Sequence, residues 1–213
     1  MQNAAGRNKG IIAGNVLLGL GIFMVLMSAC IYGFNRYEDM KFSADEQVIT
    51  DKIKAEISQA PSETETSDPS SKKGSSSAFG GSTFCISEID GCLYDGYLTI
   101  PAADLEIAVF DDCSEKNLKK GACRYYGSPE TDDLIIAGHN YKSTFGKLRK
   151  LSSGDKVYFT DMAGNISEYT VKDIEVIGGT EISRMLNGDW DLTLYTCTYG
   201  GRERLTIRCE RSA

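Results

Sequence analysis

The sequence predicts a mainly β domain at the end of a membrane-anchored chain. Residues 85–213 contain short alternating apolar runs separated by turn residues, a pattern typical of strands. A long uncharged apolar run lies near the N-terminus, and a Ser-rich stretch separates it from the β pattern. Six to eight short strands favour an antiparallel-rich barrel or sandwich.

The first expected element is an apolar helix from Ile11 to Phe34, in which Asn15 is the only strongly polar residue. A helix of that length spans roughly 36 Å, enough for the ~30 Å hydrocarbon layer. The run is longer than the apolar part of a cleaved signal peptide, so we expect residues 1–34 to hold a cytoplasmic tip and an uncleaved anchor. The acidic, Ser-rich chain that follows favours an N-inside orientation.

Cys30 allows a second interpretation of this segment. The string from Met27 to Cys30 resembles a lipoprotein cleavage box, with Met where Leu is usual. Cleavage there would leave a lipid-modified Cys30 at a new N-terminus. We favour the uncleaved anchor, in which Cys30 is a thiol within the membrane; both interpretations place the bulk of the chain outside it.

Residues 35–60 are expected to form a juxtamembrane helical stalk. Ser43 and Glu46 have the S-x-x-E spacing of a capping box, and Ile49, Ile53 and Ile57 recur every four residues. One thin apolar stripe suits self-association, contact with the following domain, or a solvated stalk. We favour the solvated stalk.

Residues 61–84 are expected to form a flexible linker. From residue 61 to 83, 16 of 23 residues are Ser, Thr, Gly or Pro. Such a segment cannot bury enough apolar surface to offset the entropy of ordering it. As a flexible coil it reaches roughly 27 Å, so we expect a tether for the domain that follows.

Residues 85–213 are expected to form one folded unit. The strands are predicted at 105–109, 134–137, 155–160, 166–177, 192–199 and 204–209. Turns at 161–165 and 200–201 predict two hairpins, and short helical pieces fit 143–151 and 181–186.

Composition excludes several classes of function. The chain has 23 Lys and Arg against 30 Asp and Glu, and its net charge of −7 disfavours a general nucleic-acid binder. A single histidine excludes any multi-His metal site. Hydrophobic residues make up 41% of the chain, so wholesale disorder is excluded as well.

The single histidine, His139, follows a predicted strand, and Cys197 lies near the end of another. Taken alone, a histidine is more often a polar surface or core residue, and a strand cysteine is usually a small buried hydrophobe. As a pair they suggest nucleophilic catalysis, because a thiol with a pKa of about 8.5 needs a nearby imidazole to activate it. Arg204 begins the next strand and can stabilise an oxyanion.

Strand parity favours Arg204 over Arg202 for that role. If residues 198–203 close a hairpin, Cys197 lies opposite Arg204, within the ~4.5–5.5 Å that separates opposed Cβ atoms. The same register pairs apolar residues that would face a core: Leu192 with Cys209, Leu194 with Ile207, and Thr196 with Leu205. A slip of one residue would mix the two faces. Arg202 falls in the Gly-rich turn, where we expect a solvated charge.

Three short sequence motifs of this chain resemble those of the sortase family. The resemblance is carried by Ala137 to Asn140, Thr193 to Cys197, and Arg204 to Arg208, and it extends over about Tyr97 to Glu210. It implies an eight-stranded β-barrel and a cysteine transpeptidase on the outer face of a Gram-positive cell membrane, held by a single membrane pass. Cys197 would be the nucleophile, His139 the proton donor and acceptor, and Arg204 the oxyanion ligand.

The resemblance also implies partners. They are secreted proteins with a C-terminal sorting signal of the LPxTG kind, and an amine acceptor from a cell-wall precursor or a pilin lysine. Asn140 and Thr196 would support the site. No cofactor and no metal are expected, since no acidic cluster matches a regulatory Ca²⁺ site. The stretch between Cys197 and Arg204 is shorter than in housekeeping members, which leaves the sorting motif open.

The remaining cysteines leave alternatives open. Cys209 shares strand parity with two apolar residues and is expected in the core. Cys85, Cys92, Cys113 and Cys123 could form two disulfides in one of three connectivities, or remain free thiols. Their spacings of six and nine residues disfavour zinc binding.

Two other functions compete with transpeptidation. A membrane-anchored cysteine peptidase would use the same chemistry and end in hydrolysis, although the Cys-before-His order of papain-like enzymes is reversed here. A non-catalytic surface binding module would need no activated thiol.

Overall fold

The computed structural model describes residues 3–59, 86–186 and 188–212. The chain divides into two compact units, Met1–Lys41 and Phe42–Ala213, and each is treated by itself below. The predicted linker at 61–84 and Cys85 lie outside the described residues.

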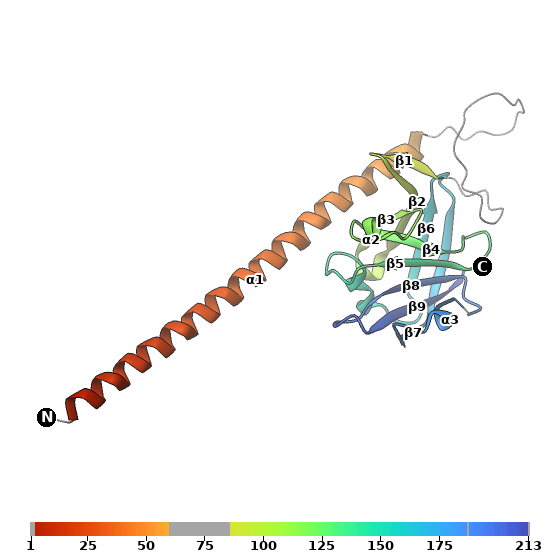
Figure 1. The fold of residues 1–213 in the computed structure, drawn as a ribbon. Coiled ribbons are helices and arrows are strands. Elements are labelled where there is room, and N and C mark those ends of the chain that lie inside the picture. Colours follow the sequence, from red (N-terminus) through yellow and green to blue (C-terminus); the bar gives the residue numbers. More distant parts are fainter. Residues whose placement is uncertain (1–2, 60–85, 187, 213) are drawn as a thin grey trace, which may run out of the picture. The chain divides into compact units, whose positions relative to one another are not determined.

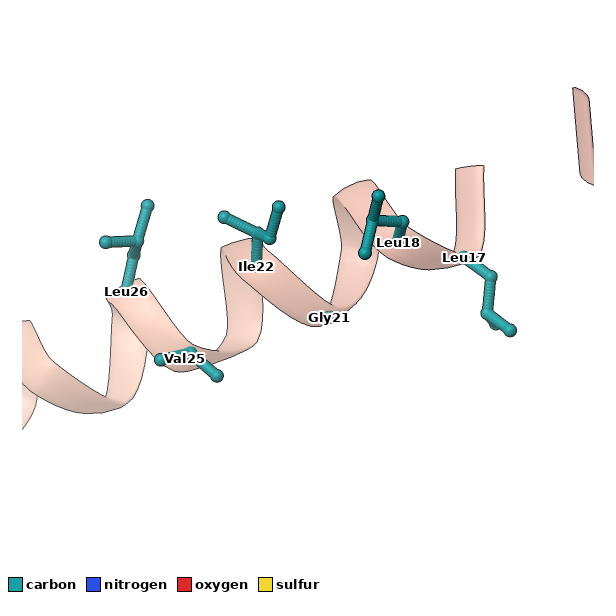
Figure 2. A pocket seen from close by; sticks show the side chains of 6 residues that line it. All are labelled: Leu17, Leu18, Gly21, Ile22, Val25 and Leu26. Carbon is teal, nitrogen blue, oxygen red and sulfur yellow. The ribbon is translucent and has the colours of Figure 1, made fainter. Parts of the chain in front are cut away.

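Helix α1 (Asn3–Gln59) contains the predicted apolar segment. Its stretch Asn15–Tyr37 has a mean hydropathy of 2.2 and is long enough to cross a membrane by length and composition. Figure 2 shows leucine, isoleucine and valine side chains projecting from successive turns of this stretch, with Gly21 between them. They are more than half exposed.

The second unit is built on an eight-stranded closed barrel. The sheet order is β2-β3-β4-β5-β8-β9-β7-β6, and β6 pairs back onto β2. Strands β3 and β4, and strands β5 and β8, are parallel; the other neighbours are antiparallel. A ninth strand, β1, pairs only with β2, outside the closed ring. The predicted mainly β, eight-stranded barrel is therefore confirmed.

The nine strands within the described residues have these bounds: β1 Ser87–Ile89, β2 Cys92–Ile100, β3 Leu105–Phe110, β4 Ala122–Tyr126, β5 Leu134–Gly138, β6 Lys156–Asp161, β7 Ile166–Gly178, β8 Leu192–Cys197 and β9 Glu203–Arg211. Four short helices connect them: η1 Pro101–Ala103, α2 Glu115–Leu118, η2 Phe145–Lys150 and α3 Ile182–Leu186. In Figure 1 strands β5, β8, β9 and β7 follow one another across the face of the barrel.

Alternating side chains fill the inside of the barrel. The inner core is one cluster of buried residues from every barrel strand together with η1 and η2. The inward set on β8 and β9 is the one that parity predicts: Leu192, Leu194, Leu205, Ile207 and Cys209. Burial raises the pKa of the Cys209 thiol to about 12, so this cysteine behaves as a small hydrophobe.

Strand β2 was not expected from the sequence, because it contains a bulge. The register shifts between Tyr94 and Gly96, and Gly96 has a φ of 149°. A Cβ on Gly96 would lie 1.9 Å from the carbonyl oxygen of Thr160 on β6. The β2–β6 pairing that closes the barrel therefore requires glycine at this position.

The predicted helix start at Ser43 is wrong, because α1 continues through this position to Gln59. The expectation of a solvated stalk is also wrong. Ile53 has no exposed surface, and Ile49 and Ile57 pack against the same cluster of buried residues on the barrel. An apolar stripe repeated every four residues indicates one buried helix face, and here the barrel supplies the surface that buries it.

One disulfide is present among the described cysteines, and it joins Cys113 to Cys123. It closes the segment between β3 and β4 that carries α2. Cys92, Cys197 and Cys209 are not disulfide-bonded. Of the two alternatives for the four outer cysteines, a disulfide is therefore correct for this pair.

Removing the Cys113–Cys123 disulfide is expected to destabilise the barrel unit. The two cysteines have a sequence separation of 10. Removing a crosslink of this span lowers the free energy of unfolding by about 2–3 kcal/mol, because the unfolded chain gains conformational freedom. The double variant Cys113→Ser/Cys123→Ser of the full chain, unfolded by urea in detergent, tests this against Cys92→Ser. Equal midpoints for the two variants would contradict the prediction.

Candidate functional site

His139 and Cys197 lie at the same end of two neighbouring strands. Strands β5 and β8 are parallel, and their register places Gly138 opposite Thr196. His139 and Cys197 are the next residues along each strand, and adjacent strands lie ~4.8 Å apart. Both side chains are half-buried. The strand pairing thus brings an imidazole and a thiol to one edge of the barrel.

The end of β5 is fixed by close packing beneath His139. A Cβ on Gly138 would lie 2.6 Å from the ring of Phe145 in η2. Thr144, which precedes η2, donates a hydrogen bond of 3.0 Å from its hydroxyl to the carbonyl of His139. The imidazole ring lies 5.2 Å from the ring of Tyr141, centroid to centroid. The turn after β5 therefore folds back and holds the histidine backbone.

The surroundings of His139 favour the neutral form of its imidazole. Burial lowers the pKa of His139, and the positive charge of Lys119 lowers it further. Lys119 follows α2, within the loop that the disulfide closes. At neutral pH this favours the imidazole over the imidazolium, so the ring has a lone pair with which to accept a proton.

Arg204 lies directly opposite Cys197 in the antiparallel β8–β9 ladder. The ladder also pairs Leu192 with Cys209, Leu194 with Ile207, and Thr196 with Leu205, so the predicted register is confirmed. The Arg204 Nη1 donates to the carbonyls of Gly201 at 2.9 Å and Glu203 at 3.1 Å. These hydrogen bonds hold the guanidinium at the β8–β9 turn, and Arg204 lies on the strand next to the one that carries the thiol. Arg202 is exposed in that turn.

The two supporting residues predicted from the sequence occupy different faces. Asn140 donates from its side-chain amide to the carbonyl of Thr198 at 3.5 Å, which links the segments that follow β5 and β8. Thr196 is 1% exposed and faces the inner core, because consecutive strand residues point to opposite sides. Its hydroxyl has no hydrogen-bond partner among the described residues. The structure brings Asn140 to the Cys197 edge and turns the side chain of Thr196 away from it.

The burial of Arg208 on β9 was not expected from the sequence. Arg208 is 2% exposed and donates to Glu175 Oε1 at 3.0 Å and to the hydroxyl of Thr193 at 3.0 Å. It also donates to the carbonyls of Arg184 at 2.7 Å and Met185 at 3.2 Å, both in α3. Arg208 therefore fastens α3 to strands β7, β8 and β9. The only signal in the sequence was that Arg208 lies four positions after Arg204 on the same predicted strand and therefore shares its face.

A small buried apolar cluster lies on the outer side of the sheet, and Tyr195 packs on it near the thiol. Tyr195, two residues before Cys197, packs on Ile135, Ile177 and Met185. Its ring also meets that of Tyr125 edge-on, with centroids 5.6 Å apart. Within the described residues, no group of three or more His, Cys, Asp or Glu side chains could hold a metal ion.

Comparison with known proteins gives the family context of this geometry. A sortase domain model matches residues 98–212. Sortase A of Listeria monocytogenes serovar 1/2a is 33% identical over 112 residues, which cover 48% of this chain and 48% of that protein. The chain spans about half the length of the curated relatives it matches.

Solved structures agree with this match. The structure of Listeria monocytogenes sortase A has a TM-score of 0.51 and 28% identity, covering 56% of this chain and 88% of that one. Clostridium perfringens sortase C, solved with the C-terminal cell wall sorting motif, has a TM-score of 0.50 and 28% identity, covering 56% and 71%.

Replacing Lys119 by Gln is expected to raise the pKa of His139. Loss of a nearby positive charge makes the imidazolium less unfavourable, so the titration moves to higher pH. Because His139 is the sole histidine, its imidazole resonances in an NMR titration of the full chain in detergent report on this group alone. Lys116→Gln, on the same loop, is the control. Equal shifts in both variants, or no shift in either, would contradict a specific effect of Lys119.

Proposed function

The chain belongs to the sortase family, and we propose that it is a membrane-anchored cysteine transpeptidase that joins proteins bearing an LPxTG-like sorting signal to an amine. The observation that carries the proposal is the register of β8, which pairs Cys197 with Arg204 on one side and, on the other, pairs Thr196 with Gly138, the residue just before His139. Nucleophile, base and oxyanion ligand thereby come from three adjacent strand ends.

The first half of the proposed reaction forms a thioester. His139 takes the proton of the Cys197 thiol, and the sulfur attacks the carbonyl carbon of the residue before the scissile bond. Arg204 leaves the turn carbonyls to stabilise the oxyanion. The C–N bond then breaks, and His139 returns the proton to the departing amine.

In the second half, an amine attacks the thioester carbonyl. Its proton passes to His139 and then to the sulfur, so that a new amide forms and the thiol is restored. The acceptor amine belongs to a cell-wall precursor or a pilin lysine. A thioester that met only water would give the hydrolytic outcome of a cysteine peptidase instead.

Positioning residues support this arrangement. Asn140 bridges the two segments that carry the thiol and the imidazole. Arg208 would hold α3 in place against the strands that carry the site. Thr196 would act through the core packing under the thiol, because its side chain faces the barrel interior.

The proposed location is the outer face of the cell membrane. The apolar stretch Asn15–Tyr37 would be the single membrane pass, with residues 1–34 contributing the cytoplasmic tip and most of the anchor. The barrel would then meet secreted proteins whose sorting signals are still close to the membrane. The Cys113–Cys123 disulfide supports an oxidising compartment for this unit.

The decisive experiment is capture of the thioester. The full chain in detergent is incubated with a library of LPxTG-like pentapeptides, with and without an added amine, and examined by intact mass spectrometry. We expect an acyl adduct on the parent and on Cys92→Ala, and none on Cys197→Ala. Cys92 is a suitable control because, among the described residues of the barrel unit, it is the other half-buried free thiol.

Each product pattern has a distinct meaning in that experiment. An amine-linked product supports transfer, whereas exclusive hydrolysis supports the peptidase. An adduct that persists on Cys197→Ala would place the nucleophile elsewhere. A thiol that reacts no faster than free cysteine, with no adduct, would favour a non-catalytic binding module.

Replacing Arg204 by Ala is expected to lower the transfer rate by ~10²-fold or more, the usual scale for losing an oxyanion donor. Arg202→Ala removes a nearby exposed guanidinium from the same turn and is expected to stay close to the parent rate. Single-turnover transfer rates of the two variants provide the comparison. Loss at Arg202 with near-normal activity at Arg204 would overturn the assignment.

A further inference from the structure

A second apolar cluster lies outside the barrel, and the end of α1 covers it. This outer cluster consists of Ile53, Ile89, Tyr94, Ala108, Phe110, Cys123, Ala137 and Met162. Its members come from α1 and from barrel strands β2 to β5, with β1 and the turn after β6. Ile53 is fully buried in it, and Ile49 and Ile57 pack at its edge.

Charged contacts hold the helix on this cluster. Lys52 pairs with Asp90 in the β1–β2 turn at 2.5 Å, and Lys54 pairs with Glu106 on β3 at 2.6 Å. Lys54 also lies over the ring of Tyr97, 5.4 Å from its centroid. These exposed contacts fall on both sides of Ile53 and flank the apolar contact between residues 46–59 and the barrel.

The outer cluster extends from the helix to the strands of the candidate site. Ala137 belongs to it, and Tyr195 packs against it. These two residues are directly paired across β5 and β8. Tyr195 and Cys197 are two positions apart on β8 and so share one face, and His139 follows Ala137 by two positions just beyond the end of β5. The outer cluster therefore reaches the face of β8 that bears the thiol, beside the strand end that His139 follows.

We propose that residues 46–59 of α1 are a positioning element of the active centre, so that undocking this helix from the outer cluster slows transfer while the barrel remains folded. The inference rests on the proposed transpeptidase function. Its physical basis is that a shift of about 1 Å in a reacting group can cost up to ~10² in rate. Ile53 is the central positioning residue, and the two lysines set its depth.

The test undocks the helix by charge reversal in the full chain. In Lys52→Glu/Lys54→Glu both ion pairs become repulsive while every core residue is retained. Adding Asp90→Lys and Glu106→Lys restores opposite charges and should restore docking. Ile53→Ala removes the central apolar contact, Ile53→Val conserves it, and Val48→Ala is the matched control because Val48 is 55% exposed on the same helix.

Three measurements are made in detergent micelles: kcat and KM for transfer, the pH dependence of Cys197 alkylation by iodoacetamide, and thermal unfolding. We expect the charge-reversed variant and Ile53→Ala to lose at least ~10-fold in kcat and to show an altered alkylation profile. The four-fold charge swap, Ile53→Val and Val48→Ala should behave like the parent.

The outcomes separate this inference from the proposed function. Parental kcat and a parental alkylation profile in the charge-reversed variant would overturn the positioning role, even if Ile53→Ala fails to fold. Loss of kcat that the charge swap does not restore would also overturn it. If the parent itself forms no thioester, the transpeptidase proposal fails, and the alkylation profile alone still decides whether the helix positions the thiol.

Discussion

Strand β8 is hydrogen-bonded on both sides, in parallel to β5 and in antiparallel orientation to β9, and the arrangement around Cys197 depends on this double register. Because side chains alternate, a slip of one residue on either side would exchange the core face for the site face. Leu192 and Leu194 would then leave the inner core, so apolar burial penalises the slip. The packing of the barrel interior is thus what holds the thiol beside its neighbours.

The part of this register that involves β9 was predictable from the sequence. The apolar residues of β8 and β9 pair in only one way through a six-residue connection, and Arg204 falls opposite Cys197 as a consequence. The pairing with β5 was not predicted, because parallel neighbours are joined by long connections that leave no local signal. The strand β2 was missed because Asp95 and Gly96 look like a turn but form a bulge that closes the barrel.

Features that depend on contacts distant in sequence could not be predicted in the same way. The stripe of Ile49, Ile53 and Ile57 showed that one helix face is apolar, but the surface that covers it is assembled from five strands and the turn after β6. Arg208 was visible as a charge on a strand, yet its burial depends on α3 folding across β8 and β9. The disulfide partner of Cys113 was likewise undetermined, since spacing alone permits three connectivities.

The contact between Gly138 and Phe145 has a consequence for how this sequence can change over evolutionary time. No side chain larger than a hydrogen fits at position 138 while the phenyl ring of Phe145 occupies its present place. That ring is fully buried, so it cannot move aside into solvent. A substitution at 138 would therefore have to be preceded or accompanied by a smaller residue at 145. Related chains are expected to vary at these two positions together. This dependence restricts how the strand end that bears the histidine can change in sequence.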